Sequence, residues 1–136
     1  METVKKFAGR WGPAVVMMAV IYLASDTPGD SLPRFGLWDA LVKKGGHALG
    51  YALLALAYGR GLADGGPFTR RQGAAAVGLA VAYAVTDEAH QAFTAGRTPS
   101  PVDVVIDAAG AVAGVAAGWW ATARRGRPVR PDRRGS

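Results

Sequence analysis

Four apolar stretches of this chain approach the length of a membrane span, and charged residues interrupt the last two. About 20 helical residues cross a bilayer core, and the stretches that come near this length with few charges are residues 11–25, 46–63, 73–93 and 101–122. An ionisable side chain in the middle of a spanning helix costs about 2.5–3.5 kcal/mol. The carboxylates of the third and fourth stretches are therefore expected to have a role.

The stretches predict an all-α fold, an integral membrane four-helix bundle formed by residues 1–123. Residues 124–136 form a basic tail that we expect to be disordered and cytoplasmic. Two other interpretations stay open. Residues 11–25 follow three basic residues, which also fits a cleaved signal peptide, and a soluble helical bundle would also be rich in Ala. The absence of cysteine excludes disulfides, thiolate zinc sites and cysteine nucleophiles.

The basic residues predict the orientation of the bundle. Of the 16 Lys and Arg, three precede the first span, three lie around the connection between the second and third, and six follow the fourth. The other side holds only Arg34, Lys43, Lys44 and Arg97. The positive-inside rule then places both termini in the cytoplasm. This topology explains the net charge of +6 without a nucleic-acid partner, and the basic tail is suited to anionic membrane lipids.

The same topology gathers polar residues at the outer ends of the last three spans. Asp103 and Asp107 are four residues apart and share a helix face, as do Asp87 and Gln91. Two neighbouring carboxylates in a low dielectric require that one be protonated or that a cation lie between them. We therefore predict an outward-facing pocket with His90 beside it, whose ligand-binding residues are Lys44, His47, Tyr51, Asp87, Glu88, Gln91, Arg97, Asp103 and Asp107.

Small residues predict where helices approach closely. Gly110, Gly114 and Gly118 form a stripe along the fourth span, and Gly46 with Gly50 forms a shorter one on the second. Such stripes let another helix come near. They predict either packing within the bundle or a homo-oligomer through Gly110, Gly114 and Gly118.

Three motifs at these positions are typical of a known family. They are Lys44-x-x-His47-x-x-x-Tyr51, Asp87-Glu88-x-His90-Gln91-x-Phe93-x-x-Gly96-Arg97, and Ser100-x-x-Asp103 followed by Gly110 and Gly114. Over about residues 15–118 the chain resembles the VanZ-like family of small bacterial membrane proteins. It departs from the family pattern at Lys43, where Asp is usual, and at Asp107, where Asn is usual. The second change adds a negative charge to the predicted pocket.

The resemblance implies a multi-pass protein of the bacterial inner membrane. The family's namesake is associated with low-level resistance to the glycopeptide antibiotic teicoplanin. An outward-facing polar pocket suits a lipid-linked cell-envelope precursor or a glycopeptide. In a recognition role, Lys44 and Arg97 would hold a phosphate or carboxylate.

Other roles stay open, so whether the protein is an enzyme is undecided. In catalysis on a lipid-linked precursor, Glu88 or Asp87 would be a general base with His47 or His90 as its partner. A divalent metal would draw its ligands from His47, His90, Asp87, Glu88 and Asp107.

Two further roles use the same carboxylates. In a proton- or ion-coupled small transporter, the acidic cluster would carry the coupling ion. In a purely structural network, Asp87 would pair with Lys44 and Arg97 with Asp103. We expect Lys43 to be a solvated charge at the membrane surface.

Overall fold

The described part of the chain is entirely α-helical in its regular structure. A computed structural model describes residues 1–27 and 36–125. Its helices are α1 (Glu2–Ser25), α2 (Leu37–Leu62), α3 (Arg70–Gln91) and α4 (Pro101–Arg125). The all-α prediction is confirmed. Arg34 and the predicted tail beyond residue 125 lie outside the described residues.

Two of the helices have the length and composition of membrane spans. These are α1 and α4, and only 11% and 22% of their most apolar windows are buried inside the molecule. The core helix of a soluble bundle would be mostly buried. Helix α2 opens with the charged residues Asp39, Lys43 and Lys44, and α3 consists largely of Ala and Gly with two carboxylates near its end. The structure therefore supports two of the four predicted spans by composition.

Large apolar side chains are exposed along the bundle. Examples are Val16 and Leu23 on α1, Leu49 on α2, Leu79 on α3 and Val105 on α4, which are 60%, 67%, 61%, 43% and 66% exposed. Each of the four helices contributes at least one of them. The outer faces of the helices are therefore suited to contact with lipid.

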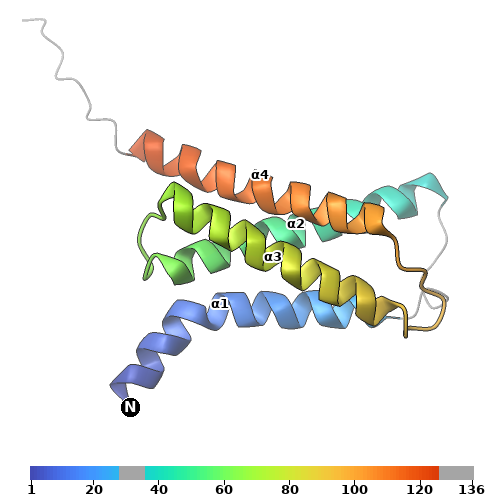
Figure 1. Cartoon of the computed structure of the whole chain (residues 1–136), viewed down its shortest axis with the longest axis horizontal. Helices are drawn as coiled ribbons and strands as arrows, with labels where there is room; N and C mark the ends of the chain where they lie inside the picture. Colours follow the sequence, from blue (N-terminus) through green and yellow to red (C-terminus); the bar gives the residue numbers. More distant parts are fainter. Residues whose placement is uncertain (28–35, 126–136) are drawn as a thin grey trace, which may run out of the picture.

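Successive helices run in opposite directions, so that their ends gather at the two ends of the bundle (Figure 1). The N-terminus and the end of α4 lie at one end of the bundle, and the connection between α3 and α4 lies at the other. Helix α1 bends after its first turns, and Pro13 lies inside this helix. Because Pro has no N–H and its ring clashes with the preceding turn, it accounts for such a bend.

The glycine stripe of α4 lies against α2 of the same chain. A Cβ atom placed on Gly110 would lie 2.2 Å from the carbonyl oxygen of Ala48, and one on Gly114 would lie 2.4 Å from that of Ala52. The two backbones are therefore too close for any side chain at these positions. Packing within the bundle is the role that this stripe has in the structure.

Aromatic rings fill glycine notches near the connection between α2 and α3. Trp11 packs against Gly61, and Trp119 packs against Gly73. The indole Nε1 of Trp119 also donates a hydrogen bond to the carbonyl oxygen of Phe68 at 3.2 Å. A side chain at either glycine would therefore collide with the ring beside it.

Candidate functional site

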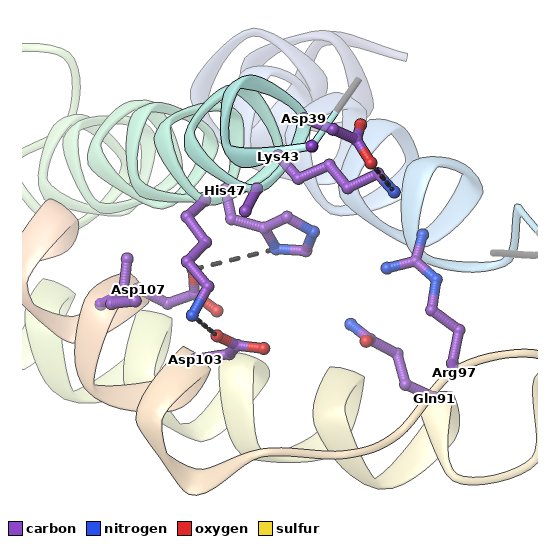
Figure 2. A pocket seen from close by; sticks show the side chains of 11 residues that line it. Asp39, Lys43, His47, Gln91, Arg97, Asp103 and Asp107 are labelled. Carbon is purple, nitrogen blue, oxygen red and sulfur yellow. Dashed lines mark ion pairs between the residues drawn. The ribbon is translucent and has the colours of Figure 1, made fainter. Parts of the chain in front are cut away.

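A polar pocket of about 290 Å³ lies toward the end of the bundle opposite the N-terminus and the end of α4 (Figure 2). The start of α2, the end of α3, the connection that follows α3 and the start of α4 contribute to it. Six of the nine residues predicted to bind a ligand line the pocket, namely Lys44, His47, Gln91, Arg97, Asp103 and Asp107. The labelled side chains reach from opposite walls toward a common space.

Two lysines of the pocket are paired with carboxylates. Lys44 Nζ lies 3.3 Å from Asp103 Oδ1 and joins α2 to α4. Lys43 Nζ lies 3.0 Å from Asp39 Oδ2, one turn earlier on α2. The pairing of Lys44 with Asp87 that a purely structural network would use is therefore wrong. Asp103, at the start of α4, is the carboxylate that faces this lysine across the helix contact.

Arg97 is held by backbone carbonyls instead of a carboxylate. Its Nε donates to the carbonyl oxygen of Thr27 at 3.3 Å, and its Nη2 donates to those of Ala24 and Thr27 at 3.2 Å. Within residues 1–27 and 36–125 it forms no ion pair, so the expected pairing with Asp103 is also wrong. The bonded carbonyls belong to the end of α1, where a cation is favourable. Among the residues that the structure describes, no carboxylate therefore neutralises the charge of Arg97.

His47 and Asp107 form the inner wall of the pocket. Their Nδ1 and Oδ1 atoms are 3.8 Å apart, which is too long for a hydrogen bond. Asp107 is only 3% exposed, and its Oδ1 has no hydrogen-bond partner among the described residues. A buried carboxylate oxygen without a partner is costly, so this atom is a natural acceptor for a donor group on a ligand.

A buried network lies beside the pocket and includes Asp87. Ser25 Oγ donates to Asp87 Oδ2 at 2.7 Å, and Tyr51 OH donates to the same oxygen at 3.3 Å. Gln91 Nε2 donates to this oxygen and to Ser25 Oγ, each at 3.4 Å. Asp87 and Tyr51 are therefore next to the pocket but do not line it. Gln91 belongs to both the network and the pocket.

Glu88 and His90 point away from this pocket. A carboxylate oxygen of Glu88 accepts a hydrogen bond from the backbone N–H of Ser100, just before α4. His90 Nε2 lies 3.1 Å from Asp26 Oδ1, and its ring lies 4.9 Å from that of Tyr22. The geometry therefore does not bring these two candidates together with His47.

A comparison with protein-family models supplies the chain's relationship to known proteins. The model described as VanZ/LLP1 matches residues 11–122, which include every residue that lines the pocket. The chain belongs to the VanZ/LLP1 family. Searches of curated proteins and of solved structures gave no match. Membership of the VanZ/LLP1 family and the two apolar helices together indicate a membrane protein.

The metal candidates of this VanZ/LLP1 protein do not form a metal site. Among residues 1–27 and 36–125, no group of three or more His, Asp or Glu side chains is placed to hold an ion. His47 faces Asp107, whereas Glu88 and His90 have separate partners. The residues present therefore do not fit a divalent cation.

Sequence reasoning about this VanZ/LLP1 protein missed three polar residues of the site region. Asp39 and Lys43 line the pocket, and Ser25 belongs to the network beside it. The expectation that Lys43 is a solvated surface charge overlooked its pairing with Asp39. The four-residue spacing of these two residues, typical of a helical ion pair, was the available signal. It was missed because the second span was predicted to begin at residue 46, whereas α2 begins at Leu37.

Proposed function

We propose that this VanZ/LLP1 protein binds the anionic group of a lipid-linked cell-envelope molecule or glycopeptide antibiotic at the outer surface of the bacterial inner membrane. All four helices span the bilayer and both termini are cytoplasmic. The clustering of Lys and Arg near the termini and around the α2–α3 connection supports this orientation. The position of the N-terminus and of the end of α4 at one end of the bundle supports it as well.

The proposal rests mainly on the position of Arg97 and on its hydrogen-bond partners. It is a guanidinium on the wall of a polar pocket, oriented by carbonyl groups and without a carboxylate partner among the described residues. Nε and Nη2 make three bonds to carbonyls, and Nη1 makes none to residues 1–27 or 36–125, which leaves its N–H groups for a ligand. Arg is suited to phosphate and carboxylate because its planar fork matches their oxygens.

The lysine pairs define the rest of the recognition site. Lys43 and Lys44 lie on the opposite wall, where their partners Asp39 and Asp103 hold them in place and balance their charge. The unpartnered oxygen of Asp107 can accept a hydrogen bond from the ligand. A ligand with an anionic group next to a hydroxyl or amide donor would match both the Arg97 guanidinium and the Asp107 oxygen.

Thermal unfolding of the purified protein in non-ionic detergent tests anion recognition directly. Glycerol 1-phosphate should raise the unfolding temperature of the wild type, because a ligand that binds only the folded state stabilises it. Arg97→Gln should abolish the shift and Arg97→Lys should retain part of it. Arg71→Gln is the matched control, since Arg71 is exposed at the start of α3. Equal shifts in all four proteins would count against the proposal.

A cellular test addresses the proposed contribution to resistance. The inhibitory concentration of teicoplanin is measured in a susceptible Gram-positive host that expresses wild type, Arg97→Gln or Arg71→Gln at matched membrane levels. We expect a rise for wild type and Arg71→Gln that is lost in Arg97→Gln. If the inhibitory concentration rises for none of the three proteins, resistance is removed from the proposed function. Anion binding is then judged by the unfolding experiment alone.

A further inference from the structure

A second cavity adjoins the polar pocket and has a different chemical character. It has a volume of about 390 Å³ and lies between α1 and α2. Its walls are mainly apolar, with Met17, Val20 and Ile21 on α1 facing Gly46 and Gly50 on α2. Its volume is within the range of small-molecule sites, roughly 300–1,000 Å³. We call it the α1–α2 groove.

The groove and the polar pocket share residues where they meet. Lys43, His47 and Arg97 line both cavities. A single ligand could therefore touch the three polar side chains at the junction while one part of it lies in the pocket and another in the groove. The polar part would meet cations, and the other part would meet hydrocarbon.

Glycine creates the space on the α2 side. A Cβ atom on Gly46 would meet no other atom within 4 Å, and one on Gly50 would lie 3.5 Å from Ile21 Cγ1. Gly46 is therefore not needed for close helix packing, in contrast to Gly110 and Gly114. The missing side chain leaves the groove open.

The groove also opens toward the apolar outer surface of the bundle. Its wall residues Val20 and Val42 are 52% and 70% exposed. In a membrane this surface faces acyl chains, so a molecule can enter from the side without leaving the bilayer.

We infer that the α1–α2 groove holds the hydrocarbon chain of an anionic amphiphile whose charged group lies in the polar pocket. This inference rests on the proposed function and narrows it to lipid-linked ligands that enter between α1 and α2. The chain gains little by moving from lipid into the groove, because the bilayer is equally apolar. The groove lets the charged group reach Arg97 while the hydrocarbon chain of the ligand stays within the apolar layer of the membrane.

Photolabelling of the full-length protein in phosphatidylcholine nanodiscs tests the inference. The probe is hexadecyl phosphate with a diazirine in mid-chain, and labelled peptides are mapped by mass spectrometry. Gly46→Leu fills the groove, and Gly45→Leu is its matched control. Gly45 lines neither cavity, and a Cβ there also meets nothing within 4 Å. Both variants should therefore fold, which circular dichroism checks.

We expect labelling of α1 and α2 around the groove that excess unlabelled hexadecyl phosphate competes away. Gly46→Leu should reduce this saturable labelling at least fivefold, and Gly45→Leu should leave it unchanged. Saturable labelling elsewhere, no saturable labelling, or equal labelling in the two variants would overturn the inference.

The glycerol 1-phosphate experiment keeps the two proposals separate. If this headgroup analogue stabilises the wild type through Arg97 but Gly46→Leu does not alter photolabelling, the groove assignment fails and anion recognition stands. If Gly46→Leu blocks labelling but Arg97→Gln does not alter it, the chain site stands and the assignment of the charged group to Arg97 fails.

Discussion

Adding a methyl group at Gly110 should destabilise the bundle, although Ala is the better helix former. The new Cβ would lie 2.2 Å from Ala48 O and 2.8 Å from both Ala48 C and Ala48 Cα. All three are backbone atoms, so no side-chain rotation can relieve the clash. Since ordinary contacts of a Cβ begin at 3.4 Å, α2 and α4 must separate locally by about 1.2 Å, the difference between 3.4 and 2.2 Å.

The magnitude follows from two opposing effects. Overpacking a tight contact costs about 1–3 kcal/mol and occasionally more, and a clash with backbone in the largest helix interface belongs at the upper end of this range. The gain in helix propensity from Gly to Ala is about 1 kcal/mol. The Gly110→Ala variant should therefore lose about 2 kcal/mol of unfolding free energy.

Gly78→Ala provides the matched comparison. Gly78 is exposed in the middle of α3, and a Cβ there would meet nothing within 4 Å. This variant should gain up to about 1 kcal/mol from helix propensity alone. Unfolding by SDS titration in mixed micelles, followed by Trp fluorescence, measures both variants against the wild type.

The substitution at Gly110 should also disturb the pocket. Gly110 lies one turn from Asp107, and Ala48 follows His47 directly. Separation of the helices would lengthen the His47–Asp107 contact and weaken stabilisation by glycerol 1-phosphate. If Gly110→Ala proved as stable as Gly78→Ala, with unchanged anion binding, the close approach of α2 and α4 would be refuted.

Three further substitutions probe single contacts, each measured by SDS titration. Ser25→Ala removes the 2.7 Å hydrogen bond to buried Asp87 and should cost about 1–3 kcal/mol; no loss would show that water replaces the hydroxyl. Glu88→Ala removes the acceptor for the N–H of Ser100 and should cost about 1 kcal/mol, the usual net contribution of one hydrogen bond, whereas an unchanged stability would argue against this contact. Lys44→Met should change stability by less than about 1 kcal/mol because its ion pair is partly exposed, yet it should weaken binding of glycerol 1-phosphate; a larger loss of stability than of binding would assign Lys44 a structural role.

The convergence of polar residues at one end of the bundle could be predicted from the sequence. Span length and alternating direction place the end of α3 beside the start of α4, and the four-residue spacing of Asp103 and Asp107 puts both on one face. This reasoning found most of the residues that line the pocket. The glycine stripe likewise indicated a close helix contact, although it left the partner open.

The choice of partners could not be predicted. Asp87 and Glu88 are adjacent in sequence, but side chains of adjacent helical residues diverge by about 100°. One enters the buried network and the other reaches the start of α4. Which neighbour each meets depends on how the helices are rotated, and periodicity does not contain that information. The first residues of α2 were not predicted to be helical, because a charged segment such as this one is also typical of a solvated loop. Only the structure shows that these charges face a pocket.

The middle of the bundle is a tightly packed core. Tyr51, Leu54 and Ala55 have no exposed surface, and Trp11 and Trp119 pack against Gly61 and Gly73. A molecule that moved from the pocket along the axis of the bundle would meet this packed core. In the proposed function, the protein is therefore a receptacle that a ligand enters and leaves at the pocket end of the bundle. In that role, its effect would depend on how long the ligand stays bound, so dissociation kinetics would describe it better than flux.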